Sequence, residues 1–235
     1  MIERKMETQP IIQAKHVMRE YKLGKTIIPA LKDIDVIIYH KDFIVIAGPS
    51  GSGKTTLLNL IGLIDKPTSG EVWIQNINTS TRNPNSLHPL RRDKIGYIFQ
   101  TFNLIPVLTV FENVEYPLIL QRISRYKRRK LVEEALDKVG LSSRLRHRPR
   151  ELSGGERQRV SIARAIVKKP ALVLADEPTA NLDSKTGIEI LQLMLALHEE
   201  EHTTFVFSSH DQSIIDMAKR TVCLRDGAVE EIKET

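Results

Sequence analysis

The stretch that decides how this chain folds reads Gly48-Pro49-Ser50-Gly51-Ser52-Gly53-Lys54-Thr55. It matches the pattern G-x-x-x-x-G-K-[ST], in which a glycine-rich loop connects a buried strand to a helix. The short apolar run Phe43–Ala47 comes directly before the loop, and a helix is expected to begin at Lys54. A strand, a glycine loop and a helix in this order are typical of a site for nucleotide phosphates.

The residues of this loop have distinct expected roles. Glycines let the backbone turn so that successive N–H groups face phosphate oxygens, and the start of the following helix adds positive potential. Lys54 is expected to contact the β- and γ-phosphates, and the Thr55 hydroxyl is expected to bind Mg²⁺. The residues predicted to contact the nucleotide here are Gly48, Pro49, Ser50, Gly51, Ser52, Gly53, Lys54, Thr55 and Thr56.

Two acids end a second buried strand. The apolar run Ala171–Ala175 is followed directly by Asp176 and Glu177. Ligand sites of parallel α/β sheets lie at the carboxyl ends of the strands. We therefore expect Asp176 to hold Mg²⁺ through water and Glu177 to polarise the attacking water as a general base.

The remaining periodicity predicts an α/β protein with a mostly parallel sheet. Imperfect alternation of polar and apolar residues in the first forty positions indicates half-buried, antiparallel strands. Further strands are expected at Glu71–Ile74, Ile95–Gln100 and Thr204–Ser208, and one ending near Arg225. A polar loop is expected over 80–86, and a helix over 185–198 with Ile188, Leu191 and Leu195 on one face.

The segment 101–167 shows helical periodicity without a clear strand, so it is predicted to be a helical subdomain. It interrupts an α/β core that is expected to comprise residues 11–100 and 168–235. The 235 residues are consistent with one domain built from these two parts.

The amino-acid composition is that of a globular protein without a membrane-spanning segment. Hydrophobic residues make up 41% and charged residues 27% of the chain, as in an ordinary globular protein. No apolar run approaches the roughly 20 residues that a membrane-spanning helix needs. The single cysteine, Cys223, cannot form an internal disulfide, which favours a reducing compartment. The net charge is +6, but eleven Lys or Arg and only three acids lie between Arg122 and Arg150.

A third segment makes the pattern specific. Residues 152–158 read Leu-Ser-Gly-Gly-Glu-Arg-Gln, and a helix is expected from about Arg157. With the phosphate loop before it and the Asp176–Glu177 pair after it, this segment resembles the signature loop of the ATP-binding cassette (ABC) family. The resemblance covers about residues 11–231. It implies a P-loop NTPase core of the RecA type, an N-terminal antiparallel β subdomain and an inserted α-helical subdomain.

The resemblance also implies a pair of subunits that bind ATP between them. Each signature loop would then contact the nucleotide held by the second copy, through Leu152, Ser153, Gly154, Gly155, Glu156 and Gln158. Gln100 is similar to the family's switch glutamine, which contacts Mg²⁺ and the attacking water. His210 is similar to the switch histidine at the γ-phosphate. Asp183 would contact the partner subunit, and Tyr21 would stack on adenine.

Several stretches are most similar to the ATPases of macrolide-efflux and lipoprotein-release systems, among them Leu108–Val114 and Leu174–Thr179. This likeness implies an ATPase at the cytoplasmic face of the membrane that is held there by integral membrane subunits. Those subunits would dock near Phe102–Tyr116, on apolar residues such as Phe102, Leu104, Ile105 and Phe111.

A nucleic-acid-linked ABC ATPase, of the repair or translation-factor kind, is the alternative, because the basic stretch 122–150 suits an anionic partner. Repair proteins carry long coiled coils or zinc cysteines, and translation factors carry two cassettes in one chain. This sequence has one cysteine, no sustained heptad repeat and only one cassette, so no nucleic acid is expected. A small-molecule kinase has no use for the 152–158 loop. The basic stretch is thus expected to face the membrane subunit and the cytoplasmic leaflet, or only solvent.

Overall fold

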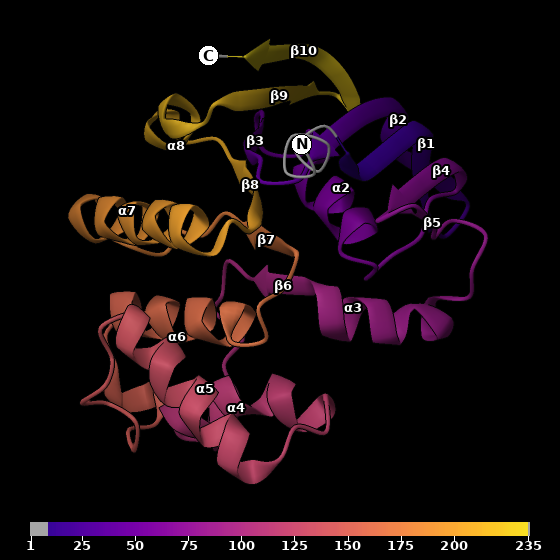
Figure 1. The fold of residues 1–235 in the computed structure, drawn as a ribbon. Helices are drawn as coiled ribbons and strands as arrows, with labels where there is room; N and C mark the ends of the chain where they lie inside the picture. The colour runs from indigo at the N-terminus through magenta and orange to yellow at the C-terminus, as the bar shows by residue number, and fades with distance from the viewer. Residues whose placement is uncertain (1–8, 235) are drawn as a thin grey trace. The chain divides into compact units, whose positions relative to one another are not determined.

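The computed structural model describes residues 9–234, except for the side chains of Pro84 and Ser213. The chain divides into two compact units, Met1–Arg91 with Thr204–Thr235, and Arg92–Thr203. Figure 1 labels the elements of both. The predicted helical segment 101–167 lies wholly within the second unit.

The first unit contains the predicted antiparallel sheet. Its strand order is β2 (Thr26–Tyr39), β1 (Pro10–Leu23), β4 (Ser69–Ile74) and β5 (Ile77–Asn78). Leu31, Ile34, Val36 and Ile38 are buried, whereas the alternate residues Asp35 and Ile37 are exposed. This alternation confirms the half-buried strands that the sequence predicts.

The first unit also contains four strands of a mainly parallel sheet, in the order β10 (Ala228–Glu234), β9 (Arg220–Arg225), β3 (Phe43–Ala47) and β8 (Thr204–Ser209). β3 is parallel to both β8 and β9. All of its residues are buried, as expected for an inner parallel strand. The ring centroid of Phe207 lies 4.7 Å from that of Phe43 and 5.8 Å from that of Phe205.

Other elements of the first unit depart from the prediction. The strand near Arg225 continues through a turn at Asp226 and Gly227 into β10, which is antiparallel to β9. The sequence does not predict β10, because this segment is mostly charged. The short helices α3 (His88–Lys94) and α8 (Gln212–Met217) also lack a clear apolar period. The predicted loop over 80–86 runs into a 3₁₀ turn, η1 (Pro84–Leu87), while α2 (Lys54–Ile61) begins where predicted.

The second unit contains two parallel strands and most of the helices. The strands are β6 (Ile95–Ile98) and β7 (Leu172–Asp176). The helices are α4 (Val110–Leu120), α5 (Arg125–Lys138), the 3₁₀ turn η2 (Pro149–Glu151), α6 (Gly154–Ile166) and α7 (Ser184–Glu201). The described part of the chain has no strand between β6 and β7, as the helical periodicity predicts. None of the helices within residues 9–234 combines the length and apolarity needed to cross a bilayer.

Side-chain caps set the starts of three helices in this unit. Thr109 with Glu112 forms a capping box at α4, and Ser153 with Glu156 forms another at α6. The Asp183 carboxylate accepts a hydrogen bond from the Thr186 amide at the start of α7.

These boundaries correct three predictions. α6 begins at Gly154 and not near Arg157, because the capping box fixes its first turn. β6 ends at Ile98, so Gln100 lies in the turn after the strand. On α7, Ile188 is exposed, and the buried face contains Ile190, Leu191, Met194 and Leu197.

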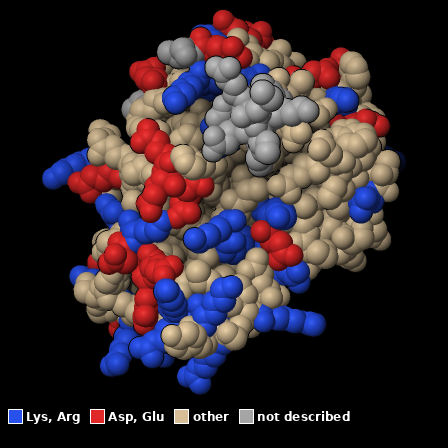
Figure 2. Space-filling view, viewed as in Figure 1, with Lys and Arg blue, Asp and Glu red and all other residues tan. Residues whose placement is uncertain are grey.

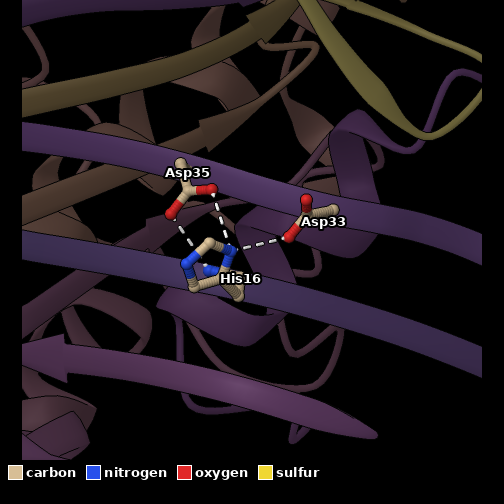
Figure 3. A group of neighbouring side chains, drawn as sticks. All are labelled: His16, Asp33 and Asp35. Atoms are coloured by element: carbon tan, nitrogen blue, oxygen red, sulfur yellow. Dashed lines mark hydrogen bonds and ion pairs between the residues drawn. The ribbon is translucent and has the colours of Figure 1, made fainter.

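An exposed ionic cluster lies where β1 and β2 lose register (Figure 3). The His16 Nδ1 atom is 2.9 Å from a carboxylate oxygen of Asp33 and 3.4 Å from one of Asp35. The His16 amide donates to Asp35 as well. The hydrogen bond to Asp33, together with the negative charges of Asp35 and Asp33, raises the pKa of His16 above its ordinary value of 6.5.

We predict that this cluster stabilises the first unit more at low pH than at high pH. A group whose pKa is raised by folding contributes fully below its unfolded pKa and loses its contribution as the pH rises through the folded pKa. Urea unfolding of the wild type and of His16→Asn should therefore differ more at pH 5.5 than at pH 8.5. Asparagine is chosen because it tolerates the left-handed backbone of this position, where φ is 49°. An equal difference at both pH values would contradict the prediction.

Candidate functional site

The loop between β3 and α2 is shaped by glycines that no other residue can replace. A Cβ atom at Gly48 would lie 2.2 Å from the Leu224 carbonyl oxygen, and one at Gly53 would lie 2.7 Å from the Ala30 carbonyl oxygen. Gly53 has a φ of 103°, in the region that favours glycine. The loop is thus pressed against two backbone segments, which fixes its curvature.

Lys54 lies inside this loop. Its ammonium donates to the carbonyl oxygens of Gly48 at 2.8 Å and Pro49 at 2.9 Å, and its side chain is buried. The buried Ser52 hydroxyl has no hydrogen-bond partner among the described residues. A buried hydroxyl of this kind is costly unless something else bonds to it. The loop therefore offers a positive charge and an unused polar group at the start of a helix.

The turn between β9 and β10 contacts this loop, and the sequence does not predict that contact. The Gly227 amide, in the turn between β9 and β10, donates to the Ser52 carbonyl at 3.2 Å. The Gly227 carbonyl in turn accepts from the Lys32 amide at 2.7 Å. Gly227 has a φ of 82°, and Asp226-Gly227 is a strong turn signal in the sequence. The sequence indicates the turn, but it does not indicate that the turn contacts the loop.

His210 leaves the sheet at the same edge as the loop. β3 and β8 are parallel, and Ala47 is in register with Ser209. The residues that follow, Gly48 and His210, therefore both start at the carboxyl ends of neighbouring strands. His210 is exposed, and the Ser209 hydroxyl accepts from the Asp211 amide at 3.0 Å, which shapes the turn around it.

Tyr21, the predicted adenine-stacking residue, lies on β1 with its ring orientation fixed. Its hydroxyl donates to Asp65 at 2.9 Å, and the Arg19 guanidinium lies 4.5 Å from the ring centroid. Arg19 also pairs with Asp65 at 2.9 Å. One face of the ring is therefore covered by a cation, while the side chain as a whole remains exposed.

In the second unit, the predicted acid pair and the switch glutamine come together. β6 and β7 are parallel, with Ile98 in register with Ala175, so the residues beyond both strands meet at one edge. The Gln100 amide nitrogen lies 3.4 Å from a Glu177 carboxylate oxygen, and the Gln100 carbonyl accepts from Asn181 at 2.8 Å. Glu177 has a φ of 42°, which is a strained conformation for a residue with a side chain.

Asp176 occupies the last position of β7 and is partly buried. Burial, with a smaller contribution from the negative charge of Asp176, raises the pKa of the nearby Tyr97 phenol. Asp176 therefore lies at the end of the strand that carries Glu177, close enough to Tyr97 to interact with it electrostatically.

The predicted signature loop begins α6. The Ser153 hydroxyl accepts from the Glu156 amide at 3.2 Å, and the Glu156 carboxylate accepts from the Ser153 amide at 2.9 Å. The hydrogen bond from the Ser153 backbone, assisted by Arg144, lowers the pKa of Glu156. Gly155 is required here, because a Cβ atom would lie 2.6 Å from the Thr186 methyl group. The loop thus packs against the start of α7, where Asp183 is exposed.

Gln158 is placed differently from the rest of this loop. Its side chain is fully buried, and its amide donates to the Pro178 carbonyl at 2.6 Å. Gln158 thus contacts the segment that follows Glu177 in its own chain. Leu152 is also buried, whereas Ser153, Gly154, Gly155 and Glu156 are at least partly accessible.

Comparison with known proteins gives one consistent result. A family model described as ABC transporter matches residues 31–180. An uncharacterized ABC transporter ATP-binding protein of Methanocaldococcus jannaschii, MJ0796, is 49% identical over 224 residues, which are 94% of this chain and 95% of that protein. The macrolide export ATP-binding/permease protein MacB of Wolinella succinogenes is 42% identical over 94% of this chain, which matches 34% of MacB.

A solved structure agrees with these relatives. It is the dimeric structure of a post-hydrolysis state of the ATP-binding cassette MJ0796, bound to ADP and Pi. Its TM-score to this chain is 0.88 at 47% sequence identity, and the match covers 95% of this chain and 98% of that one. A likeness of this extent confirms the predicted P-loop α/β fold.

We predict that Gly48→Ala is far more destabilising than Gly51→Ala. Both glycines have positive φ, but a Cβ at Gly51 meets no atom within 4 Å, whereas one at Gly48 meets the Leu224 carbonyl. Gly51→Ala should cost about 1–2 kcal/mol of unfolding free energy, from the backbone conformation alone. Gly48→Ala should cost roughly 3 kcal/mol or more. Equal shifts in the urea midpoint would show that the loop does not press on Leu224.

Proposed function

This chain belongs to the ATP-binding domains of the ABC transporter family, and we propose that it hydrolyses ATP to drive a membrane-embedded partner. The observation that carries the proposal is the loop at the start of α2. It brings together the Lys54 ammonium, the Ser52 hydroxyl, which has no hydrogen-bond partner among the described residues, and the start of a helix whose N-cap residue, Gly53, has no side chain. A phosphate group supplies the negative charge and the acceptors that all three require.

The nucleotide is held by residues of the first unit. Gly48–Thr56 surround its phosphates with backbone amides, and Lys54 exchanges its bonds to loop carbonyls for the β- and γ-phosphates. Tyr21 stacks on the adenine through the ring face that Arg19 leaves open. His210 bonds to the γ-phosphate from the neighbouring strand end.

Magnesium is proposed to bind to Thr55, Gln100 and Asp176. A hydroxyl, an amide oxygen and a carboxylate are the hard oxygen donors that Mg²⁺ prefers, so the residues present suit the ion. When bound, the ion neutralises charge on the β- and γ-phosphates.

Glu177 is proposed as the general base. It takes a proton from a water molecule, whose oxygen attacks the γ-phosphorus while the bond to the β–γ bridging oxygen breaks, giving ADP and phosphate. Gln100, 3.4 Å from Glu177, orients the same water without changing its charge near neutral pH.

Two copies of the chain are proposed to form the working unit. The Gly154 and Gly155 amides lie in the first turn of α6, where a helix has no internal partners for them. With Leu152, Ser153 and Glu156, they would contact the nucleotide held by the second copy, and Asp183 would lie at the same interface. Gln158 supports this loop from within. The dimeric MJ0796 cassettes support such an arrangement.

The membrane partner is proposed to dock near Phe102–Tyr116. A groove of about 420 Å³ lies beside this segment, lined by residues that include Phe111, Glu115, Arg125 and Arg146. Val107 and Tyr116 are exposed in the same segment, and Asn113 ties residues 105–109 to α4. The chain is thereby held at the cytoplasmic face of the membrane.

The relatives named for macrolide export favour an efflux or release system over a nucleic-acid-linked ATPase. The basic stretch 122–150 fits that setting. Figure 2 shows Lys and Arg side chains projecting where Figure 1 draws α4 and α5. Arg128 contacts Glu115 at 2.8 Å and Arg129 contacts Glu133 at 2.9 Å, so part of this charge is neutralised within the chain. Lys130, Lys138 and Arg144 also pair with acids of the chain, whereas Arg125 and Lys127 are exposed and would face the partner and the anionic leaflet.

We predict that Lys54→Ala abolishes ATP binding and that Glu177→Gln retains binding but loses turnover. The first variant removes the charge inside the loop, and the second removes the proton acceptor. Fluorescent-nucleotide titration and phosphate release measure the two effects. Size-exclusion chromatography with ATP should show Glu177→Gln as a stable dimer. Lys25→Ala, at an exposed hairpin turn, is the control. Turnover by Glu177→Gln at the wild-type rate would remove Glu177 from the role of base.

We predict that neutralising Arg125 and Lys127 together weakens assembly with the membrane partner but leaves ATP binding intact. Both side chains are exposed at the start of α5. Arg128→Gln is the contrasting variant: the Arg128 side chain is 19% exposed and also donates to the Ile123 carbonyl, so its loss should lower stability instead. Co-purification with the membrane protein encoded beside this chain measures assembly. If the double variant assembles as well as the wild type, Arg125 and Lys127 contact only solvent and the prediction is wrong.

A further inference from the structure

One flank of α6 contacts both loops that carry the proposed hydrolytic residues. The Arg164 guanidinium donates to the carbonyl oxygens of Phe102 at 2.7 Å and Asn103 at 2.5 Å. Phe102 and Asn103 are the second and third residues after Gln100. Because the two carbonyls accept from different nitrogens of one rigid, planar group, the turn after Gln100 is fixed in both position and orientation.

The turn that Arg164 holds is strained. Phe102 has a φ of 62° and Asn103 a φ of 47°, so two consecutive residues with side chains adopt the left-handed conformation. Such a conformation persists only where the surroundings enforce it. The Arg157 guanidinium adds a second contact, 5.2 Å from the centroid of the Phe102 ring. Burial lowers the pKa of Arg164 to about 10, so the guanidinium remains charged at neutral pH.

Gln158 makes the corresponding contact on the other loop. Its amide donates at 2.6 Å to the carbonyl of Pro178, the residue after Glu177, and the side chain is fully buried. Glu177 is itself strained, with a φ of 42°. Side chains of a single helix therefore bond to the backbone that follows Gln100 and to the backbone that follows Glu177.

We propose that Arg164 and Gln158 are positioning residues that hold Gln100 and Glu177 of the same chain in register for hydrolysis. Both side chains donate to backbone carbonyls of their own chain. Gln158 acts through the carbonyl of the residue after Glu177, and Arg164 acts through carbonyls two and three residues after Gln100. The inference rests on the proposed roles of Gln100 and Glu177, and it gives α6 a function in its own subunit besides presenting its first turn to the second copy.

The test compares substitutions that keep charge or volume but remove the contact. Arg164→Lys keeps the positive charge, but one ammonium cannot match the two-pronged geometry at Phe102 and Asn103. Gln158→Met keeps the volume and removes the donor. A misplacement of a reacting group by about 1 Å costs on the order of 100-fold in rate, so kcat for ATP should fall roughly 10- to 100-fold in each variant. The affinity for fluorescent ATP should change little, and the lost hydrogen bond should lower the melting temperature by only a few degrees, so that each variant stays folded at the assay temperature.

The matched control is Arg159→Lys on the same helix. Arg159 contacts the Val139 carbonyl at 3.3 Å and Glu189 at 3.7 Å, away from both hydrolytic loops. It should retain wild-type kcat. If Arg164→Lys fails to fold, Arg157→Leu and Gln158→Met test the same two loops independently.

A double-mutant comparison separates positioning from general stability. In a Gln100→Ala background, Arg164→Lys should cause no further loss of kcat, because the residue through which it acts is already gone. If the fold-losses of kcat from Gln100→Ala and Arg164→Lys multiply in the double variant, the proposal is wrong. It is also wrong if Arg164→Lys and Gln158→Met both retain wild-type kcat. Failure of the wild-type chain itself to bind and hydrolyse ATP would instead refute the proposed function.

Discussion

The uncapped start of α2 is the constraint on which the first unit depends. The first amides of any helix have no partners within it. In α6 and α7, Ser153 and Asp183 supply side-chain acceptors, but α2 starts after Gly53, and no side chain within residues 9–234 caps it. A helix start of this kind, beside the Lys54 ammonium, suits an anion, as the proposed function requires. The neighbouring carbonyls of Leu224 and Ala30 exclude any residue other than glycine at the turns that shape it.

The start of α6 in the second unit also has amides without partners inside the helix, but it satisfies them differently. α6 satisfies part of its own start with the Ser153–Glu156 capping box, which leaves the glycine amides at the surface and keeps the helix rigid. The flank of this helix then serves as a fixed support for the ends of β6 and β7. The residues of the predicted signature loop thus differ in burial. Ser153, Gly154 and Gly155 are accessible, whereas Gln158 is buried.

The sequence predicts those features of the fold whose signal is local. The loop at Gly48–Thr55, the strand β3 and the start of α2 follow from glycine spacing and an apolar run, and the structure has the same boundaries. The sequence misplaces the start of α6 because Gly154 and Gly155 are poor helix formers, and only the capping box shows that the helix includes them. The charged strand β10 has no apolar alternation that would predict its pairing with β9. Among the site residues, the acids at the end of β7 follow from a local pattern, whereas the contacts of Arg164 and Gly227 depend on which distant segments fold together.

Three of the six non-glycine residues with positive φ in the described second unit lie where the proposed chemistry occurs. Phe102, Asn103 and Glu177 all have positive φ, at a cost of about 1–2 kcal/mol for each residue relative to a right-handed or extended backbone. Relaxing any of them would turn Gln100 or Glu177 away from the shared edge of β6 and β7. The Arg164 guanidinium and the buried amide of Gln158 oppose that relaxation, since each would lose its carbonyl partners, and a buried polar group left unpaired costs about 1–3 kcal/mol. The strained geometry is therefore the stable one.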